Sequence, residues 1–171
     1  MDNTTSIKDS KFYSLFTESL QDIYWAEQAL TEALPKMKAA ATSAALAASF
    51  EKHAQETQTH VQRLQQIFEI LGEEATGKKC EAMAGLIKEG NAIVEDTEED
   101  TAVRDAGLIM AAQKVEHYEI ATYGSLKALA NRMGIGEISS LLDQTLVNER
   151  ETNDALTALA EREVNDLAAS E

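Results

Sequence analysis

Two glutamates, Glu116 and Glu119, lie three residues apart in the segment KVEHYEIATYG (residues 114–124). On a helix this spacing puts both side chains on one face. Steps of three and four residues extend that face through side chains that are mainly apolar, namely Ile109, Ala112, Tyr123, Leu126, Ala130 and Met133. Two carboxylates therefore lie on a helix face whose apolar pattern predicts that it packs into the core.

Three other segments with helical periodicity carry polar residues at a similar place, in the middle third of their apolar stripes. The interrupting residues are Glu27 in the first segment, His53 and His60 with Glu56 beside them in the second, and Glu149 in the last. Each of four long helical segments is therefore expected to bring carboxylate or imidazole groups to the core side.

The sequence also predicts that these groups lie at one height. Glu27 and Glu56 are almost equally far from a turn expected near residue 42. Glu119 and Glu149 are almost equally far from a second turn expected near residue 135. Residues equally distant from the turn of an antiparallel helix pair lie at the same level, so the pattern predicts a single polar layer across the bundle.

Energetics limit what such a layer can be. An ionised carboxylate in a dry core costs several kcal/mol, and neighbouring carboxylates oppose each other's ionisation. The stripes contain no lysine or arginine, which leaves protons, water or metal ions as the compensating groups. Five carboxylates with two histidines match the ligands of iron, manganese or zinc better than those of calcium or magnesium. Taken singly, each residue also has a structural interpretation, such as a hydrogen-bonded core histidine at His53.

The elements that must position this layer are helices. Good helix formers are abundant, and the chain has a single proline and eight glycines. The periodicity predicts four long helices over residues 11–40, 44–71, 101–133 and 137–167, and a short amphipathic helix over residues 79–95. Ser43 is the expected N-cap of the second helix, Gly72 its stop, and Gly134 and Gly136 frame the last turn.

Two hairpins of helices with short turns, joined by the long connection of residues 73–100, indicate an all-α fold. This connectivity is that of a ferritin-like four-helix bundle with a long crossover that carries a short extra helix. We expect one domain over residues 1–171, with an ordered core of about residues 11–167.

Composition narrows the possible partners. The formal net charge of −15 disfavours nucleic acid and anionic membranes and is compatible with metal cations. No apolar run is long enough to span a bilayer, and the polar segment MDNTTSIKDS does not have the pattern of a secretory signal. The single cysteine, Cys80, excludes an intramolecular disulfide. A cytoplasmic location is expected, and no motif favours a hydrolase or a transferase.

Several segments resemble the bacterial YciF-like family, a stress-associated branch of the ferritin-like superfamily related to rubrerythrins. They are YWAEQAL (24–30), HAQET (53–57), RLQQIFEILG (63–72), CEAMAGLIKEG (80–90), VRDAGLI (103–109), AAQKVEHYEIATYG (111–124) and TALAE (157–161). The resemblance covers about residues 12 to 161. It implies a ferritin-like bundle and a homodimer, for which the crossover helix around Met83 and Ile87 is a candidate interface.

The resemblance also implies a metal site. Carried over residue by residue, the superfamily's metal positions fall on Glu27, Glu56, Glu119 and Glu149, with Glu116 and His53 next to them. The metal implied is iron or manganese, with zinc as a further option. The segment ERETN departs from the superfamily pattern, because it has no histidine after Glu149.

Three functional interpretations follow. The first is a di-metal protein that handles peroxide, oxygen or iron during stress. The second is a structural or protein-interaction bundle that keeps the fold without the metal. A ferritin-type storage shell ranks third, since storage requires a cage of many subunits and nothing in the sequence indicates one.

Overall fold

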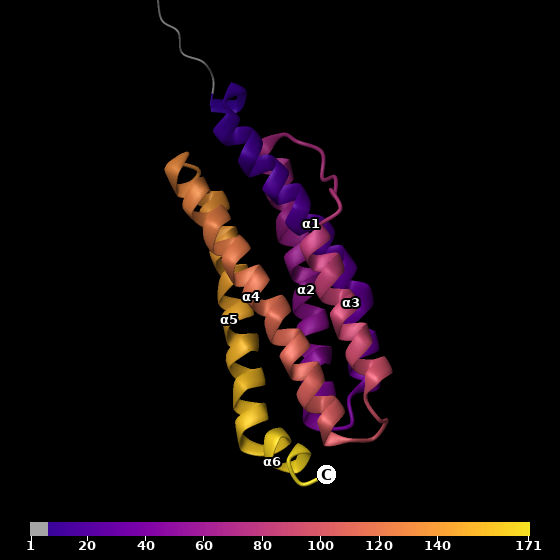
Figure 1. The fold of residues 1–171 in the computed structure, drawn as a ribbon. Coiled ribbons are helices and arrows are strands. Elements are labelled where there is room, and N and C mark those ends of the chain that lie inside the picture. Colours follow the sequence, from indigo (N-terminus) through magenta and orange to yellow (C-terminus); the bar gives the residue numbers. More distant parts are fainter. Residues whose placement is uncertain (1–6) are drawn as a thin grey trace, which may run out of the picture.

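The computed structural model describes residues 7–171, and in that range it contains helices and no strand. The elements are a 3-10 turn at Ile7–Asp9, α1 (Lys11–Ala40), α2 (Ala44–Leu71), α3 (Glu81–Asp96), α4 (Ala102–Arg132), α5 (Gly136–Leu159), a π-helical turn at Ala160–Val164 and α6 (Asn165–Ala168). Figure 1 shows the α1–α2 and α4–α5 hairpins lying side by side, with α3 beside α1. The predicted all-α bundle with a helical crossover is confirmed. Residues 1–6 of the polar N-terminal segment lie outside the described residues.

The helix ends follow local capping chemistry. Ser10, Ser43 and Thr101 are N-caps whose hydroxyl oxygens accept a backbone N–H three residues later. The Cys80 sulfur does the same for α3. Gly72 ends α2 with φ of 69°, in the left-handed region that glycine adopts without a steric penalty. The predicted N-cap at Ser43 and the predicted stop at Gly72 are therefore confirmed.

The crossover helix α3 packs against both α1 and α4. Met83 is fully buried in the core, and Ile87 is partly buried and packs against it. Met83 is therefore covered within the chain, and a dimer interface on the crossover helix stays a prediction. The apolar side of α3 closes part of the α1–α4 seam.

One end of the bundle is joined by the first turn of α4. The buried Asp105 carboxylate accepts the backbone N–H groups of Thr42 and Ser43, at 2.8 and 2.7 Å. The neighbouring Arg104 donates to the carbonyl oxygens of Val94 and Thr97, at 3.1 and 2.5 Å. Adjacent residues of α4 thus hold both the α1–α2 turn and the end of α3, which fixes the relative heights of the two hairpins.

The helix predicted over residues 137–167 has the expected range, since the chain is helical from Gly136 to Ala168, but it is not a single regular α-helix. A π-helical turn at Ala160–Val164 interrupts it, with Val164 buried, and α6 then packs against α4. The Glu171 carboxylate accepts the backbone N–H groups of Ala102 and Val103, at 2.8 and 3.1 Å. These donors belong to the first turn of α4 and have no partner within that helix.

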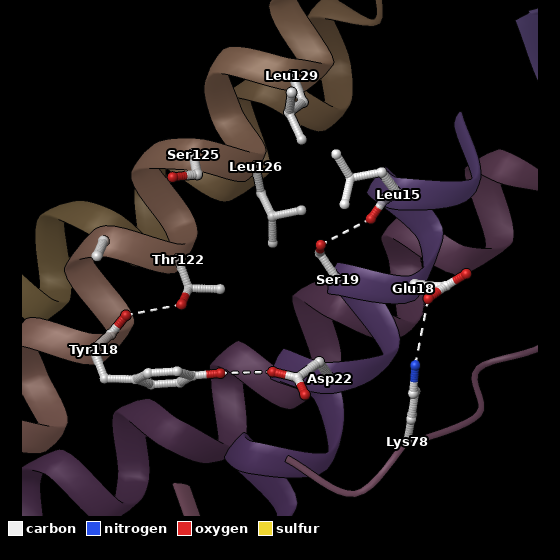
Figure 2. Close-up of a pocket in the computed structure, with 11 residues that line it drawn as sticks. Leu15, Glu18, Ser19, Asp22, Lys78, Tyr118, Thr122, Ser125, Leu126 and Leu129 are labelled. Atoms are coloured by element: carbon white, nitrogen blue, oxygen red, sulfur yellow. Dashed lines mark hydrogen bonds and ion pairs between the residues drawn. The ribbon is translucent and has the colours of Figure 1, made fainter. Parts of the chain in front are cut away.

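The α1–α4 seam is open where α3 does not cover it. Figure 2 shows this groove, of about 570 Å³, between residues of α1 and α4. On its wall the Tyr118 hydroxyl donates to the Asp22 carboxylate at 2.7 Å, and the Cys80 sulfur lies 3.1 Å from the same hydroxyl. Within residues 7–171, none of the helices combines the length and apolar composition that a membrane span requires.

The contact between α3 and α4 at Gly107 can be tested by adding one methyl group. A Cβ at Gly107 would lie 2.7 Å from Cγ2 of Ile93, which is a stiff β-branched side chain. We expect Gly107→Ala to introduce strain of about 1–3 kcal/mol and to lower the free energy of unfolding measured by urea denaturation.

Gly124→Ala is the matched control, because Gly124 lies in the same helix and a Cβ there would meet nothing within 4 Å. The control is expected to stabilise the protein by up to about 1 kcal/mol through helix propensity. Equal free energies of unfolding for the two variants would contradict close packing of α3 on α4.

Candidate metal centre

Most of the predicted site residues come together in the middle of the bundle. Glu27 of α1, His53 of α2, Glu116 and Glu119 of α4, and Glu149 of α5 are all buried, with no more than 2% of their surface exposed. Helical periodicity points each of them inward, and the fixed height of the hairpins brings them to one level. The predicted polar layer is present.

These side chains form two groups that share one carboxylate. In the first group, His53, Glu116, Glu119 and Glu149 each offer a nitrogen or oxygen atom, and these atoms lie within 4.8 Å of one another. In the second group, Glu27, His60 and Glu149 do the same. Each group therefore has the size and the donor atoms of a metal site, and Glu149 can serve both.

The contacts within the groups are close. His60 Nδ1 lies 2.9 Å from Glu149 Oε1 and 3.4 Å from Glu27 Oε1. His53 Nε2 lies 3.4 Å from Glu116 Oε1, and His53 Nδ1 lies 4.0 Å from Glu149 Oε2. The Tyr123 hydroxyl donates a short hydrogen bond to Glu27 Oε1. Side chains from α1, α2, α4 and α5 thus meet around Glu27 and Glu149.

Glu56 and His60 differ from the sequence-based assignment. Glu56 belongs to neither group: its side chain is 21% exposed and its Oε1 lies 3.1 Å from the Lys52 ammonium on the preceding turn. Its Oε2 is buried without a hydrogen-bond partner. His60, which was not among the assigned metal ligands, is fully buried and belongs to the second group. The available signal was its spacing of seven residues from His53 on the same stripe.

The layer contains many polar atoms without hydrogen-bond partners. Among the described residues they include both carboxylate oxygens of Glu119, one oxygen each of Glu27, Glu116 and Glu149, and both ring nitrogens of His53. His60 Nδ1 and Glu149 Oε1 are not counted here, because they face each other at 2.9 Å as an ion pair. Unsatisfied buried polar groups are rare, and each costs roughly 1–3 kcal/mol. Because these atoms are metal-ligand types and converge on one space, they fit the metal that the fold implies.

Burial and mutual repulsion change the proton affinities in the layer. Burial, together with the charge of Glu149, raises the pKa of Glu116 and of Glu119 well above the ordinary value. Burial acts to lower the pKa of His60, but Glu27 and Glu149 outweigh it and raise the pKa to about 10. Burial lowers the pKa of His53.

The pKa of the Glu149 carboxylate is shifted in the opposite direction to the pKa values of Glu116 and Glu119. Burial acts to raise its pKa, but His60 beside it lowers the pKa overall. Without metal, the layer therefore holds protons on Glu116 and Glu119 and an ion pair between His60 and Glu149. Protons occupy some of the positions that a cation would take.

The layer is separate from the groove between α1 and α4. The residues that line the groove and those of the two groups do not overlap. Figure 2 shows Asp22 and Tyr118 facing each other across the groove, one on α1 and the other on α4. The chemistry of the layer is therefore suited to an ion or a very small molecule, since its carboxylates are packed inside the bundle.

Comparisons with solved structures agree with this fold. The crystal structure of the Escherichia coli stress protein YciF matches with a TM-score of 0.87 and 43% identity, over 91% of this chain and 98% of that one. YcfI of Rhodopseudomonas palustris, described as "a putative structural protein", matches with a TM-score of 0.84 and 39% identity, over 89% and 96% of the two chains. A Xanthomonas campestris protein, 21% identical with a TM-score of 0.73, shares the fold.

Sequence comparison extends the likeness to most of the chain. Protein YciF of Escherichia coli (strain K12) is 44% identical over 152 residues, which cover 88% of this chain and 91% of that protein. The model of a domain of unknown function, DUF892, matches residues 11–169. The predicted resemblance to YciF-like proteins is confirmed, and the chain belongs to the DUF892 family.

Proposed function

We propose that this protein is a stress-associated ferritin-like protein whose polar layer binds one or two transition-metal ions, iron or manganese. The observation that carries the proposal is the set of buried carboxylate and imidazole atoms without hydrogen-bond partners. A hydrophobic layer or a hydrogen-bonded network would avoid this cost, and a divalent cation would offset it. The stress context is supported by the likeness to YciF, which is called a stress protein.

The two groups supply comparable donors although α5 offers no histidine. His53 provides a nitrogen to the first group and His60 to the second, both from α2. Glu149, from α5, supplies oxygen atoms to both groups and would be a ligand common to the two. This arrangement supports two adjacent positions. Iron or manganese held there would supply one-electron chemistry toward peroxide or oxygen.

The second candidate is a structural bundle without metal. It is favoured by the description of the R. palustris relative as "a putative structural protein". In that case protons alone would compensate the carboxylates, and Glu149 would serve as the partner of His60. The homodimer and the cytoplasmic location stay predictions from the resemblance and the composition.

Metal binding can be tested by thermal unfolding. Protein stripped with a chelator is melted alone and with Mn²⁺, Zn²⁺ or, without oxygen, Fe²⁺. A cation bound only by the folded state at about 100 times its dissociation constant adds about 2.7 kcal/mol of stability. We expect the wild-type midpoint to rise, and Glu149→Gln, which removes the carboxylate common to both groups, to abolish most of the rise.

Glu151→Gln is the control, since it removes the same charge from an exposed position on the same helix. It is expected to keep the metal-induced rise. If none of the three cations raises the wild-type midpoint near neutral pH, the metal proposal is wrong and the structural candidate takes its place.

Proton uptake by the metal-free layer gives a pH-dependent prediction. Glu119 has a raised pKa when folded, so the folded state keeps a proton that the unfolded state releases above its ordinary pKa of 4.5. This contribution to stability is complete below 4.5 and is lost as the pH rises through the folded pKa, at up to about 1.4 kcal/mol per pH unit. Glu119→Gln, which imitates the protonated acid, removes this dependence.

Urea denaturation in the presence of a chelator, from about pH 5 to about pH 8, measures the effect. We expect wild type to lose stability relative to Glu119→Gln as the pH rises, and Glu151→Gln to follow wild type. Parallel pH profiles for wild type and Glu119→Gln would show that Glu119 does not take up a proton on folding.

A further inference from the structure

The imidazole of His60 has different neighbours on its two nitrogens. Nδ1 faces the layer, 2.9 Å from Glu149 Oε1 and 3.4 Å from Glu27 Oε1. Nε2 faces out of the layer, 3.4 Å from Oδ1 of Asn148 on α5. Which nitrogen carries the proton in the neutral ring therefore depends on Asn148.

The orientation of the Asn148 amide is set by Arg63. The Arg63 guanidinium donates from one nitrogen to Asn148 Oδ1 at 2.9 Å and to Thr145 Oγ1 at 3.3 Å. A guanidinium has donors and no acceptor, so the amide atom it contacts must be the oxygen. This contact decides between the two orientations of the amide, which differ only in the places of oxygen and nitrogen.

An oxygen at this position can only accept a hydrogen bond from His60. Nε2 of His60 therefore carries the hydrogen, and in the neutral ring Nδ1 carries the lone pair. That lone pair lies on the side of Glu27 and Glu149, the other members of its group. Metal-binding histidines usually donate their second ring N–H to such an acceptor, which fixes the tautomer and the ring orientation.

We propose that Asn148, oriented by Arg63, is a positioning residue that holds His60 with its proton on Nε2 and so presents Nδ1 to a metal ion between Glu27 and Glu149. The inference rests on the proposed metal site and adds the residues that prepare one of its two positions. His53 has no such arrangement, because its Nε2 and Nδ1 face Glu116 and Glu149 within the layer and neither has a hydrogen-bond partner. The ring of His60 is therefore oriented by a hydrogen bond before any metal binds, whereas the ring of His53 is not.

The test uses Zn²⁺ as the probe, because it is diamagnetic and accepts imidazole and carboxylate ligands. Affinity is measured by competition with a coloured chelator, and the protonation pattern of the His60 ring by ¹⁵N-detected imidazole NMR of the zinc-loaded protein. Asn148→Leu removes the acceptor, and Asn148→Asp keeps an oxygen for both His60 and Arg63. Gln113→Leu is the control, since it removes hydrogen bonds between α4 and α5, to Thr157 at 2.7 Å and Asn153 at 3.4 Å, without touching either histidine.

We expect Asn148→Leu to weaken one bound Zn²⁺ by about 10- to 100-fold and to change the imidazole pattern of His60. Asn148→Asp is expected to stay within a few-fold of wild type with the wild-type pattern, and Gln113→Leu to match wild type in both measurements. Arg63→Met, which leaves Asn148 but frees its amide to turn, should give a smaller loss in the same direction.

The outcomes separate this inference from the metal site itself. If wild type binds Zn²⁺ and Asn148→Leu binds it equally with an unchanged imidazole pattern, the role of Asn148 is overturned and the metal site stands. If Asn148→Leu does not fold, unchanged affinity and pattern in Arg63→Met overturn the role of the pair. If wild type takes up no Zn²⁺, the positioning role is overturned, whereas the metal site itself is decided by the unfolding measurements with Mn²⁺ and Fe²⁺.

Discussion

Buried negative charge is the constraint on which the rest of this structure depends. Glu27, Glu116, Glu119 and Glu149 lie in the middle of the bundle, and the ion-pair partners of this set are the two histidines of α2. Carboxylates so close together cannot all ionise without a compensating cation. The layer must therefore hold protons or metal ions, and its stability, its pH response and its chemistry all follow from which of the two is present.

The layer exists only because the two hairpins meet at one height. Helix periodicity aims the side chains inward, but it does not set the level of one hairpin relative to the other. Asp105 fixes this level by accepting hydrogen bonds from the backbone of the α1–α2 turn, and Arg104 binds the end of α3. These buried charged groups lie at one end of the bundle, away from the layer. They nevertheless decide which residues of the two hairpins share the level of the layer.

The two positions of the layer are chemically unlike. The group with His60 has a histidine whose outer nitrogen is occupied by Asn148, whereas both nitrogens of His53 face carboxylates. Ferritin-like di-metal sites commonly draw histidines from two helices, and here both come from α2. A bundle can thus keep a nitrogen donor in each group without a histidine after Glu149, because residues seven apart return to the same helix face.

The sequence by itself determined the helices, their caps at Ser43 and Gly72, the crossover and the existence of a polar layer, because these follow from local propensity and from periodicity along one chain. The apolar stripe of the second helix already contained His60 and left Glu56 beside it, whereas the family resemblance assigned Glu56 as a ligand. Tertiary structure decided between the two, because the packing of α2 on its neighbours brings His60 to Glu27 and Glu149 and leaves Glu56 beside Lys52. The π-helical turn after Leu159 and the burial of Met83 were likewise set by packing against α4 and α1, which no pattern within a single helix records.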